Sequence, residues 1–400
     1  MPQLDPKLKP IVNQALAPIA PSQIRFFAKQ FDQIPGIIKL TLGEPDFNVP
    51  EHVKEAAVRS IRANKSHYSD QRGIVELREA ISHYLKKRFQ VDYDAATEIV
   101  VTVGATEAIF STLASIINPG DKIIVATPTF ALYWPVIEIF GGIPIQVDTS
   151  ADNFRLTGRH LQEVLDREGA ANVKAVVLNF PGNPTGVTYS RAQLQEVADV
   201  VKQHAMYVLT DEIYAELTYG QKHTSMAELL PQQTILINGL SKSHAMTGYR
   251  IGYFAGPKAF VTNASKIHGF AITSPSNPAQ YAALEALTNG LDDAEEMRHI
   301  YQQRRDYIVP KLNELGYETQ LPAGAFYAFA KIPASFGLTS VEFATKLAEE
   351  AKVGVTPGSA FGAGGEGYVR ISYASAMTDI QEAMKRLASF TAKMTENVLN

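Results

Sequence analysis

The sequence contains no cysteine, and this absence excludes several kinds of site. Without thiols the chain can form no disulfide bond, no thiolate zinc site and no cysteine nucleophile. Its nine histidines show no spacing typical of metal ligands, such as two His four residues apart, so we predict no metal centre. A chain without disulfides suits a reducing compartment, and we expect a cytoplasmic protein.

The sequence also lacks an excess of positive charge and a long apolar run. Lys and Arg total 37 against 41 Asp and Glu, so the net charge of -4 offers no attraction for a polyanion. The N-terminus has no continuous apolar core, and later apolar stretches fall short of the ~20 residues that a membrane helix needs. We therefore expect neither nucleic acid nor a membrane as a partner.

The proportions of hydrophobic and charged residues in the sequence are typical of a globular protein. Hydrophobic residues make up 46% and charged residues 20% of its 400 residues, a length that predicts two or three domains. From about Glu51, helical periodicity alternates with short β-branched runs, which indicates an α/β fold with a mostly parallel sheet between helices. Five apolar runs are predicted to be central strands of this sheet: Ile99–Val103, Ile123–Ala126, Ala175–Asn179, Met206–Thr210 and Thr234–Ile237.

The pattern changes on both sides of this α/β region. After Ala286 the helical stretches are longer, as at Met297–Leu312 and Val341–Ala351, and Gly/Pro-rich turns separate them, which indicates a smaller α+β domain. The first ~45 residues are rich in proline and only briefly periodic, so we expect an arm that packs on another domain or another chain. We predict an arm with part of the small domain at 1–48, a large domain at 49–288 and a small domain at 289–400.

Polar residues follow several of the predicted strands. Ligands of an open α/β sheet bind outside the carboxyl ends of its strands, so these residues form a candidate site. Gly104, Ala105 and Thr106 begin a predicted helix, whose free N–H groups suit a phosphate. The other candidates come after the later strands: Asn183 in a Gly/Pro-rich turn, Asp211 with Tyr214, and Lys242 with Arg250.

A carboxylate, a lysine, an arginine and a helix start at one sheet edge match the needs of pyridoxal phosphate. The aldehyde of this cofactor condenses with a lysine, its ring nitrogen pairs with a carboxylate, and its phosphate binds amides and arginine. The residues therefore predict a pyridoxal phosphate site.

The chain also resembles a known family along nearly its whole length. The strongest matches are Asn183-Pro184-Thr185-Gly186, Asp211-Glu212-Ile213-Tyr214 and Ser241-Lys242 with Arg250, within a likeness that runs from Leu42 to Ser372. In order and spacing these motifs are similar to those of the fold-type I pyridoxal-phosphate aminotransferases of class I/II. Residues 238–248 and 366–370 look most like the bacterial N-acetyl-LL-diaminopimelate aminotransferases, and next like aromatic amino acid aminotransferases.

The resemblance implies a role at the cofactor for each matching residue. Lys242 would form the Schiff base and Asp211 would pair with the ring nitrogen. Tyr214 and Asn183 would bond to the phenolic oxygen of the ring, on which Phe130 would stack. The phosphate would be bound by the start of the helix and three further side chains: Gly104, Ala105, Thr106, Ser241, Arg250 and, from a neighbouring subunit, Tyr68.

The resemblance further implies a substrate site and a partner. Arg370 would bind the α-carboxylate of the substrate through two hydrogen bonds, helped by Asn183 and the backbone of Gly43. Because Tyr68 would reach a neighbouring site, the resemblance implies a homodimer with shared active sites. In this family the peptide bonds before the prolines that match Pro128 and Pro184 are often cis.

Two positions depart from the family pattern. Many relatives carry a phosphate-binding serine where this chain has Gly239, so either Ser241 or Ser243 replaces it or the contact is missing. Some aspartate aminotransferases carry, at the position of Thr106, a lysine for the distal carboxylate, and its absence disfavours a dedicated aspartate enzyme.

From these observations we expect a transaminase that moves an amino group between an L-amino acid and a 2-oxo acid, with glutamate and 2-oxoglutarate as one pair. N-acetyl-LL-diaminopimelate, in lysine biosynthesis, is the preferred substrate of this hypothesis. An aromatic, broad or aspartate aminotransferase and a pyridoxal-phosphate-dependent C–S lyase are the alternatives.

Overall fold

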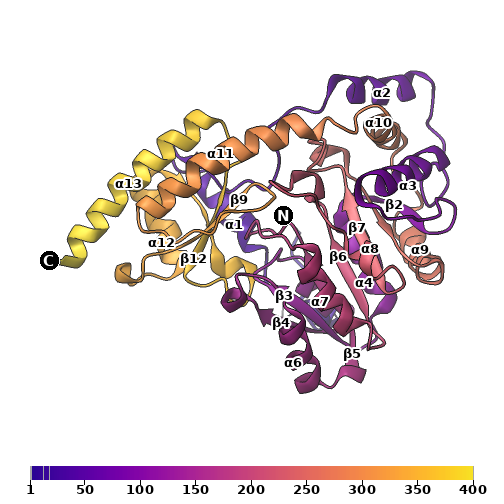
Figure 1. Cartoon of the computed structure of the whole chain (residues 1–400), viewed down its shortest axis with the longest axis horizontal. Helices are drawn as coiled ribbons and strands as arrows, with labels where there is room; N and C mark the ends of the chain where they lie inside the picture. Colours follow the sequence, from indigo (N-terminus) through magenta and orange to yellow (C-terminus); the bar gives the residue numbers. More distant parts are fainter. Residues whose placement is uncertain (1, 12, 18, 400) are drawn as a thin grey trace.

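A seven-stranded sheet forms the centre of the structure, a computed structural model that describes residues 2–11, 13–17 and 19–399 (Figure 1). β8 runs antiparallel to both of its neighbours, and the other pairs are parallel. The mostly parallel α/β architecture that the sequence predicts is therefore confirmed. In spatial order the strands are β2 (Ile99–Val103), β8 (Ile251–Ala255), β7 (Thr234–Gly239), β6 (Tyr207–Asp211), β5 (Val173–Asn179), β3 (Lys122–Thr127) and β4 (Ile143–Asp148).

Helices cover both faces of this sheet, which is why its strands are apolar on both sides. The helices on one face are α4 (Gly104–Ile116), α5 (Tyr133–Ile139) and α9 (Lys258–Ile272). Those on the other are α3 (Val75–Phe89), α6 (Gly158–Glu168), α7 (Arg191–Val201), α8 (Met226–Leu229) and α10 (Asn277–Thr288), and α2 (Glu51–Arg62) packs on α10. Short 3-10 helices lie at Pro6–Ile11, Gln14–Leu16, Ser150–Asp152, Ala170–Asn172, Ala215–Leu217, Thr247–Tyr249, Ala334–Phe336 and Gly358–Phe361.

All five predicted strands are present, but Ile99–Val103 is an edge strand, so its prediction as a central strand was wrong. Its first four residues are nevertheless buried, because Ile99 and Val101 pack under α3 and α10 while Val100 packs under α4 and α9. Burial on both faces gives an edge strand the composition of a central one. Two further strands, β4 and β8, were not predicted.

The C-terminal part of the chain, together with residues near the N-terminus, forms a second, smaller set of sheets. Three antiparallel strands, β11 (Thr356–Pro357), β12 (Tyr368–Ser372) and β9 (Tyr327–Lys331), make one sheet, and β1 (Ile38–Lys39) pairs in parallel with β10 (Val353–Gly354). The helices of this part are α1 (Gln23–Phe31), α11 (Ala294–Glu314), α12 (Ser340–Lys346) with a π-helical turn at Leu347–Ala351, and α13 (Met377–Leu399).

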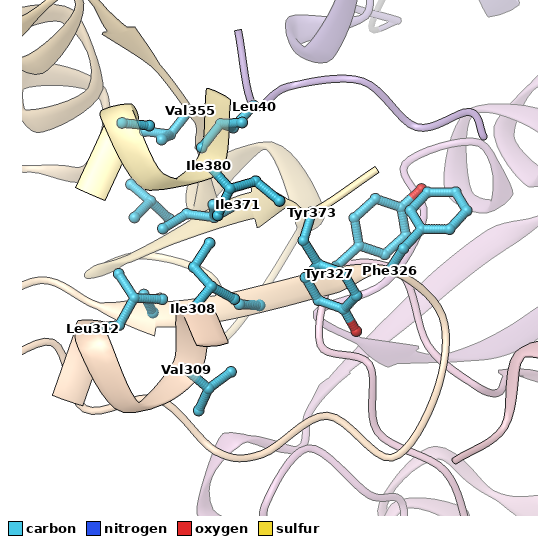
Figure 2. Close-up of a cluster of buried hydrophobic side chains, with 14 of the residues drawn as sticks. Leu40, Ile308, Val309, Leu312, Phe326, Tyr327, Val355, Ile371, Tyr373 and Ile380 are labelled. Carbon is cyan, nitrogen blue, oxygen red and sulfur yellow. The ribbon is translucent and has the colours of Figure 1, made fainter. Parts of the chain in front are cut away.

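Side chains from α11, β12 and α13 share one apolar core in this part (Figure 2). Ile308 and Leu312 of α11 meet Ile371 of β12 and Ile380 of α13, and Leu40 joins them from the N-terminal end of the chain. The predicted helices at 297–312 and 341–351 are both present. The division at residues 48 and 288 stays a prediction. Within the described ranges, no helix combines the length and the apolarity needed to cross a membrane.

Glu212 directly follows β6, and its fully buried carboxylate stabilises the end of that strand. Its oxygens accept hydrogen bonds from Thr210 Oγ1 (2.9 Å), Ser225 Oγ (3.0 Å) and the Met226 N–H (3.1 Å). The His223 ring adds a contact of 2.7 Å through Nε2. One side chain thus satisfies four polar groups that have no access to water.

We expect Glu212→Ala to lower the free energy of unfolding by about 3–5 kcal/mol, because it leaves these groups buried and unpaired. Denaturant unfolding followed by circular dichroism measures the effect. Glu196→Ala, at an exposed position of α7, should change it by less than ~0.5 kcal/mol. Equal stability of the two variants would contradict this account of the strand end.

Candidate active site

A cavity of about 780 Å³ lies at the carboxyl ends of the parallel strands. β6 ends at Asp211, and β7 ends just before Ser241 and Lys242. The start of α4 reaches the same cavity, because it follows the end of β2 directly. From the smaller sheet, Arg370 of β12 closes the other side.

Most of the residues predicted for the site line this cavity: Gly43, Ala105, Thr106, Phe130, Asn183, Asp211, Tyr214, Ser241, Lys242, Arg250 and Arg370. Gly104 lies beside it as the first residue of α4. Tyr68 lies elsewhere: its side chain is 86% exposed and borders a separate surface pocket with residues 274–278. The cavity mouth also includes Ile24 and Arg25 of α1.

Arg250 and strand β8 pack closely against the start of α4. Gly104 has a φ of +77°, and a Cβ there would lie 2.5 Å from the Arg250 guanidinium. A Cβ at Gly252 would lie 2.4 Å from the Ala105 nitrogen. Both glycines are therefore required for the arginine and strand β8 to approach a helix start whose first N–H groups have no partner within the helix.

Lys242 carries the amine of the site. Its Nζ donates a hydrogen bond to the Gly43 carbonyl oxygen and lies 5.7 Å from the centre of the Tyr214 ring. Burial lowers the pKa of the Lys242 amine to about 8, and the positive charges of Arg370 and Arg250 act in the same direction against Glu44 and Asp211. An amine with this pKa gives up its proton far more readily than an ordinary lysine, and about a tenth of it is neutral at pH 7.

Asp211 has the opposite shift. Burial raises the pKa of its carboxyl to about 6, while a hydrogen bond from the Tyr133 hydroxyl and one from the Ile213 N–H lower it. These bonds measure 2.7 and 3.2 Å. The carboxylate is 5% exposed and remains ionised at neutral pH.

Arg370 is a fully buried cation among neutral acceptors. Its guanidinium donates to Asn183 Oδ1 (2.8 Å), the Thr41 carbonyl (2.6 Å) and Thr356 Oγ1 (3.4 Å). It also stacks over the rings of Tyr327 and Phe361, at 4.5 and 5.0 Å. In the part of the chain that the structure describes, no carboxylate pairs with it and its Nε has no partner. A buried charge of this kind is suited to an anionic ligand.

Tyr214 and Asn183 are held by polar contacts at the cavity wall. The Tyr214 hydroxyl lies 2.8 Å from that of Tyr327, and the Asn183 N–H donates to Asn179 Oδ1 at 2.9 Å. Burial raises the pKa of the Tyr214 phenol well above its ordinary value, so it stays a hydrogen-bond donor. The peptide bonds before Pro128 and Pro184 are cis.

The structure distinguishes the two serines near Gly239. Ser241 lines the cavity, whereas the Ser243 hydroxyl contacts His244 Nδ1 at 2.8 Å. A side chain at position 239 would meet the Ile251 carbonyl oxygen at 2.8 Å. The backbone of β8 thus leaves no room there for a serine in this arrangement.

Sequence reasoning missed Tyr133 and Tyr327. Tyr133 is hidden in an apolar helix and contacts a carboxylate 78 residues away. Tyr327 lies on β9 of the smaller sheet and meets Tyr214 across 113 residues. No local spacing links residues so distant in the chain.

Comparisons with known proteins agree with this geometry. A model of the family "Aminotransferase class I and II" matches residues 35–387. A probable N-acetyl-LL-diaminopimelate aminotransferase of Bacillus subtilis is 44% identical, with 96% of this chain and 97% of the relative covered. An aspartate aminotransferase of Pyrococcus abyssi is 41% identical, with 92% and 95% covered.

A solved structure extends the likeness to three dimensions. The aromatic aminotransferase from Pyrococcus horikoshii superposes with a TM-score of 0.86 at 38% identity, over 92% of this chain and 99% of that one. The chain belongs to the class I and II aminotransferases, which are pyridoxal-phosphate-dependent transaminases.

Proposed function

We propose that this cavity carries out amino transfer with Lys242 as its catalytic amine, Asp211 and Tyr214 as its partners at the cofactor, and Arg370 as its substrate clamp. The observation that supports this most strongly is the pairing, in one cavity, of a buried amine whose pKa is lowered to about 8 with a buried, ionised carboxylate. Two groups with oppositely shifted pKa values are typical of acid–base catalysis.

The donors of the cavity fit pyridoxal phosphate. The start of α4 with Arg250 offers N–H groups to a phosphate, and Ser241 lies beside them on the cavity wall. Phe130 offers a flat apolar face, and Asp211 an anion for a protonated ring nitrogen. When bound, the cofactor supplies an aldehyde that accepts the amino group and a ring that withdraws electrons from the substrate.

In this proposal Lys242 has two tasks. Its Nζ would hold the cofactor aldehyde, and as a free amine it would take the proton from the α-carbon of the substrate. Because its pKa lies near 8, it can both accept this proton and return it. Asp211 would hold the proton on the ring nitrogen of the cofactor, and the Tyr214 hydroxyl and Asn183 would donate hydrogen bonds to its ring oxygen.

Arg370 orients the substrate. A guanidinium has five N–H donors, and three hydrogen bonds to the protein leave donors for both oxygens of an α-carboxylate. Asn183, already bonded to Arg370, and the backbone at Gly43 complete this side of the cavity.

For the substrate we propose N-acetyl-LL-diaminopimelate as amino donor and 2-oxoglutarate as acceptor, in a cytoplasmic biosynthetic pathway. The 44% identity to the Bacillus subtilis relative supports this choice. Arg25 at the cavity mouth, which forms no ion pair among the described residues, suits substrates with a second carboxylate. A panel of donors tests it: faster turnover of phenylalanine and tyrosine than of N-acetyl-LL-diaminopimelate would replace this substrate with an aromatic one.

For the assembly we propose a homodimer in which Tyr68 completes the phosphate site of the partner subunit. The exposed aromatic side chains of Tyr68 and Phe270 (95% exposed) and the exposed Ile61 support an interface on this face.

Adding L-glutamate to the holoenzyme should change the visible absorption of the bound cofactor and release one equivalent of 2-oxoglutarate. Lys242→Ala should slow this half-reaction by at least about 10³-fold, because it removes the base. Stopped-flow absorbance measures both. Lys266→Ala, at an exposed position of α9, is the matched control. Unchanged spectra with glutamate and with N-acetyl-LL-diaminopimelate would argue against amino transfer.

Arg370→Lys keeps the charge but loses the forked geometry of the guanidinium. We expect the KM for the amino donor to rise about 10- to 100-fold, the range for a lost charged hydrogen bond. Steady-state kinetics checks this, with Arg59→Lys on the exposed face of α2 as control. An unchanged KM would show that another group binds the α-carboxylate.

Sedimentation should give twice the chain mass of 43.8 kDa. Tyr68→Phe should weaken binding of pyridoxal phosphate by about tenfold, since a hydrogen bond to a charged group is lost, without changing the mass. A monomeric holoenzyme of full activity would refute the shared site.

A further inference from the structure

Tyr133 is the one side chain within hydrogen-bonding distance of the Asp211 carboxylate among the described residues. It begins α5, is 1% exposed, and its hydroxyl donates to Asp211 Oδ2 at 2.7 Å. Within the described part of the chain, the other oxygen, Oδ1, accepts one hydrogen bond, from the Ile213 N–H at 3.2 Å. A short hydrogen bond to an ionised oxygen is stronger than one between neutral groups.

The same ring also supports the aromatic wall of the cavity. Tyr133 meets Phe130 edge to face, with ring centres 6.0 Å apart and planes at 89°. Phe130 lines the cavity and packs partly buried on the apolar core that contains Tyr133. Tyr133 therefore contacts both residues that we place against the cofactor ring, one through its hydroxyl and one through its edge.

We propose that Tyr133 is a positioning residue, which keeps the Asp211 carboxylate charged and aimed at the ring nitrogen of the cofactor. This inference rests on the proposed role of Asp211. No substrate contact is assigned to Tyr133, because it lies behind Asp211 and Phe130 and is not among the residues that line the cavity.

The charged groups around Asp211 explain why such a donor matters. Burial and the neighbouring Glu212 both raise the pKa of the Asp211 carboxyl, while Lys242 lowers it. Tyr214, the other nearby phenol, faces Tyr327 and makes its hydrogen bond there. Burial and the charge of Asp211 raise the pKa of the Tyr133 phenol well above its ordinary value, so it remains a donor at neutral pH.

Loss of the Tyr133 hydroxyl should raise the pH below which the cofactor no longer binds. A hydrogen bond to the charged form lowers the pKa of Asp211, so removing the hydroxyl moves that pKa upward from about 6. The carboxyl of Tyr133→Phe would then take up a proton nearer neutral pH, and cofactor binding that requires the carboxylate would fail at a higher pH.

Binding of pyridoxamine 5′-phosphate to the cofactor-free protein tests this without turnover and without the covalent bond to Lys242. Because binding requires the carboxylate, we expect Tyr133→Phe to raise the dissociation constant about twofold at pH 7 and about ninefold at pH 5, the effect of a pKa that rises by about one unit from about 6. The pH of half-maximal affinity should rise by roughly one unit. Isothermal titration calorimetry across pH measures both quantities.

Two further variants separate positioning from a general structural role. Tyr253→Phe is the matched control. Tyr253 lies on β8, in the same sheet as Asp211, and is 1% exposed, like Tyr133. Its buried hydroxyl has no partner among the described residues. In an Asp211→Asn background, Tyr133→Phe should have no further effect, since the charge that the hydroxyl serves is gone. Equal weakening in both backgrounds, or the same result for Tyr133→Phe as for Tyr253→Phe, would overturn the proposal.

A measurement on the unaltered tyrosine covers the case in which Tyr133→Phe does not fold. In the cofactor-free wild-type protein, ionisation of Asp211 near pH 6 should shift the ultraviolet absorption of its hydrogen-bonded tyrosine, and Asp211→Asn should lack this shift. Identical pH difference spectra for the two proteins would refute the inference. Failure of the wild type to bind the cofactor would instead refute the proposed function.

Discussion

The charged residues of the cavity lie close together because three parallel strands end at the same edge of the sheet. In the register of the sheet Asn179 of β5 pairs with Asp211 of β6, and Asp211 pairs with Ile237 of β7. Side chains from three separate stretches of sequence therefore reach one level, and the residues just beyond β7 bring Lys242 to the same place. A parallel sheet provides such an edge, and the segments that follow its strands supply further side chains there.

Burial away from water shifts the pKa values of these groups. The same low-dielectric surroundings disfavour a charge on Lys242 and on Asp211, and so move their two pKa values toward each other. Arg370 cannot release its proton and keeps its charge although it is fully buried. Its neutral partners and two aromatic rings hold it in one orientation, which leaves its charge for an incoming anion.

The sequence allowed much of this to be predicted, since the strands, the helix start at Gly104 and the polar residues after each strand are local patterns. The contacts of Tyr133 and Tyr327 could not be predicted, because each depends on packing between residues far apart in the chain. For the same reason Ile99–Val103 was predicted to be a central strand. Its apolar composition reflects helices packed on both faces of the sheet, and it does not show whether the strand pairs with one neighbouring strand or with two. Tyr68 illustrates a further limit, since a single chain leaves its side chain exposed.

The path of the backbone has a consequence for how the protein is made. The Leu40 N–H donates a hydrogen bond to the Gly354 carbonyl oxygen, and the Thr41 carbonyl oxygen accepts one from Arg370. The N-terminal residues of the cavity therefore reach these positions only when β10 and the last strand, β12, are present. During synthesis the α/β layers can assemble first, because domains fold as units while the chain emerges from the ribosome. The cavity closes only after β12 has appeared, and a truncated nascent chain would hold a sheet without a competent substrate site.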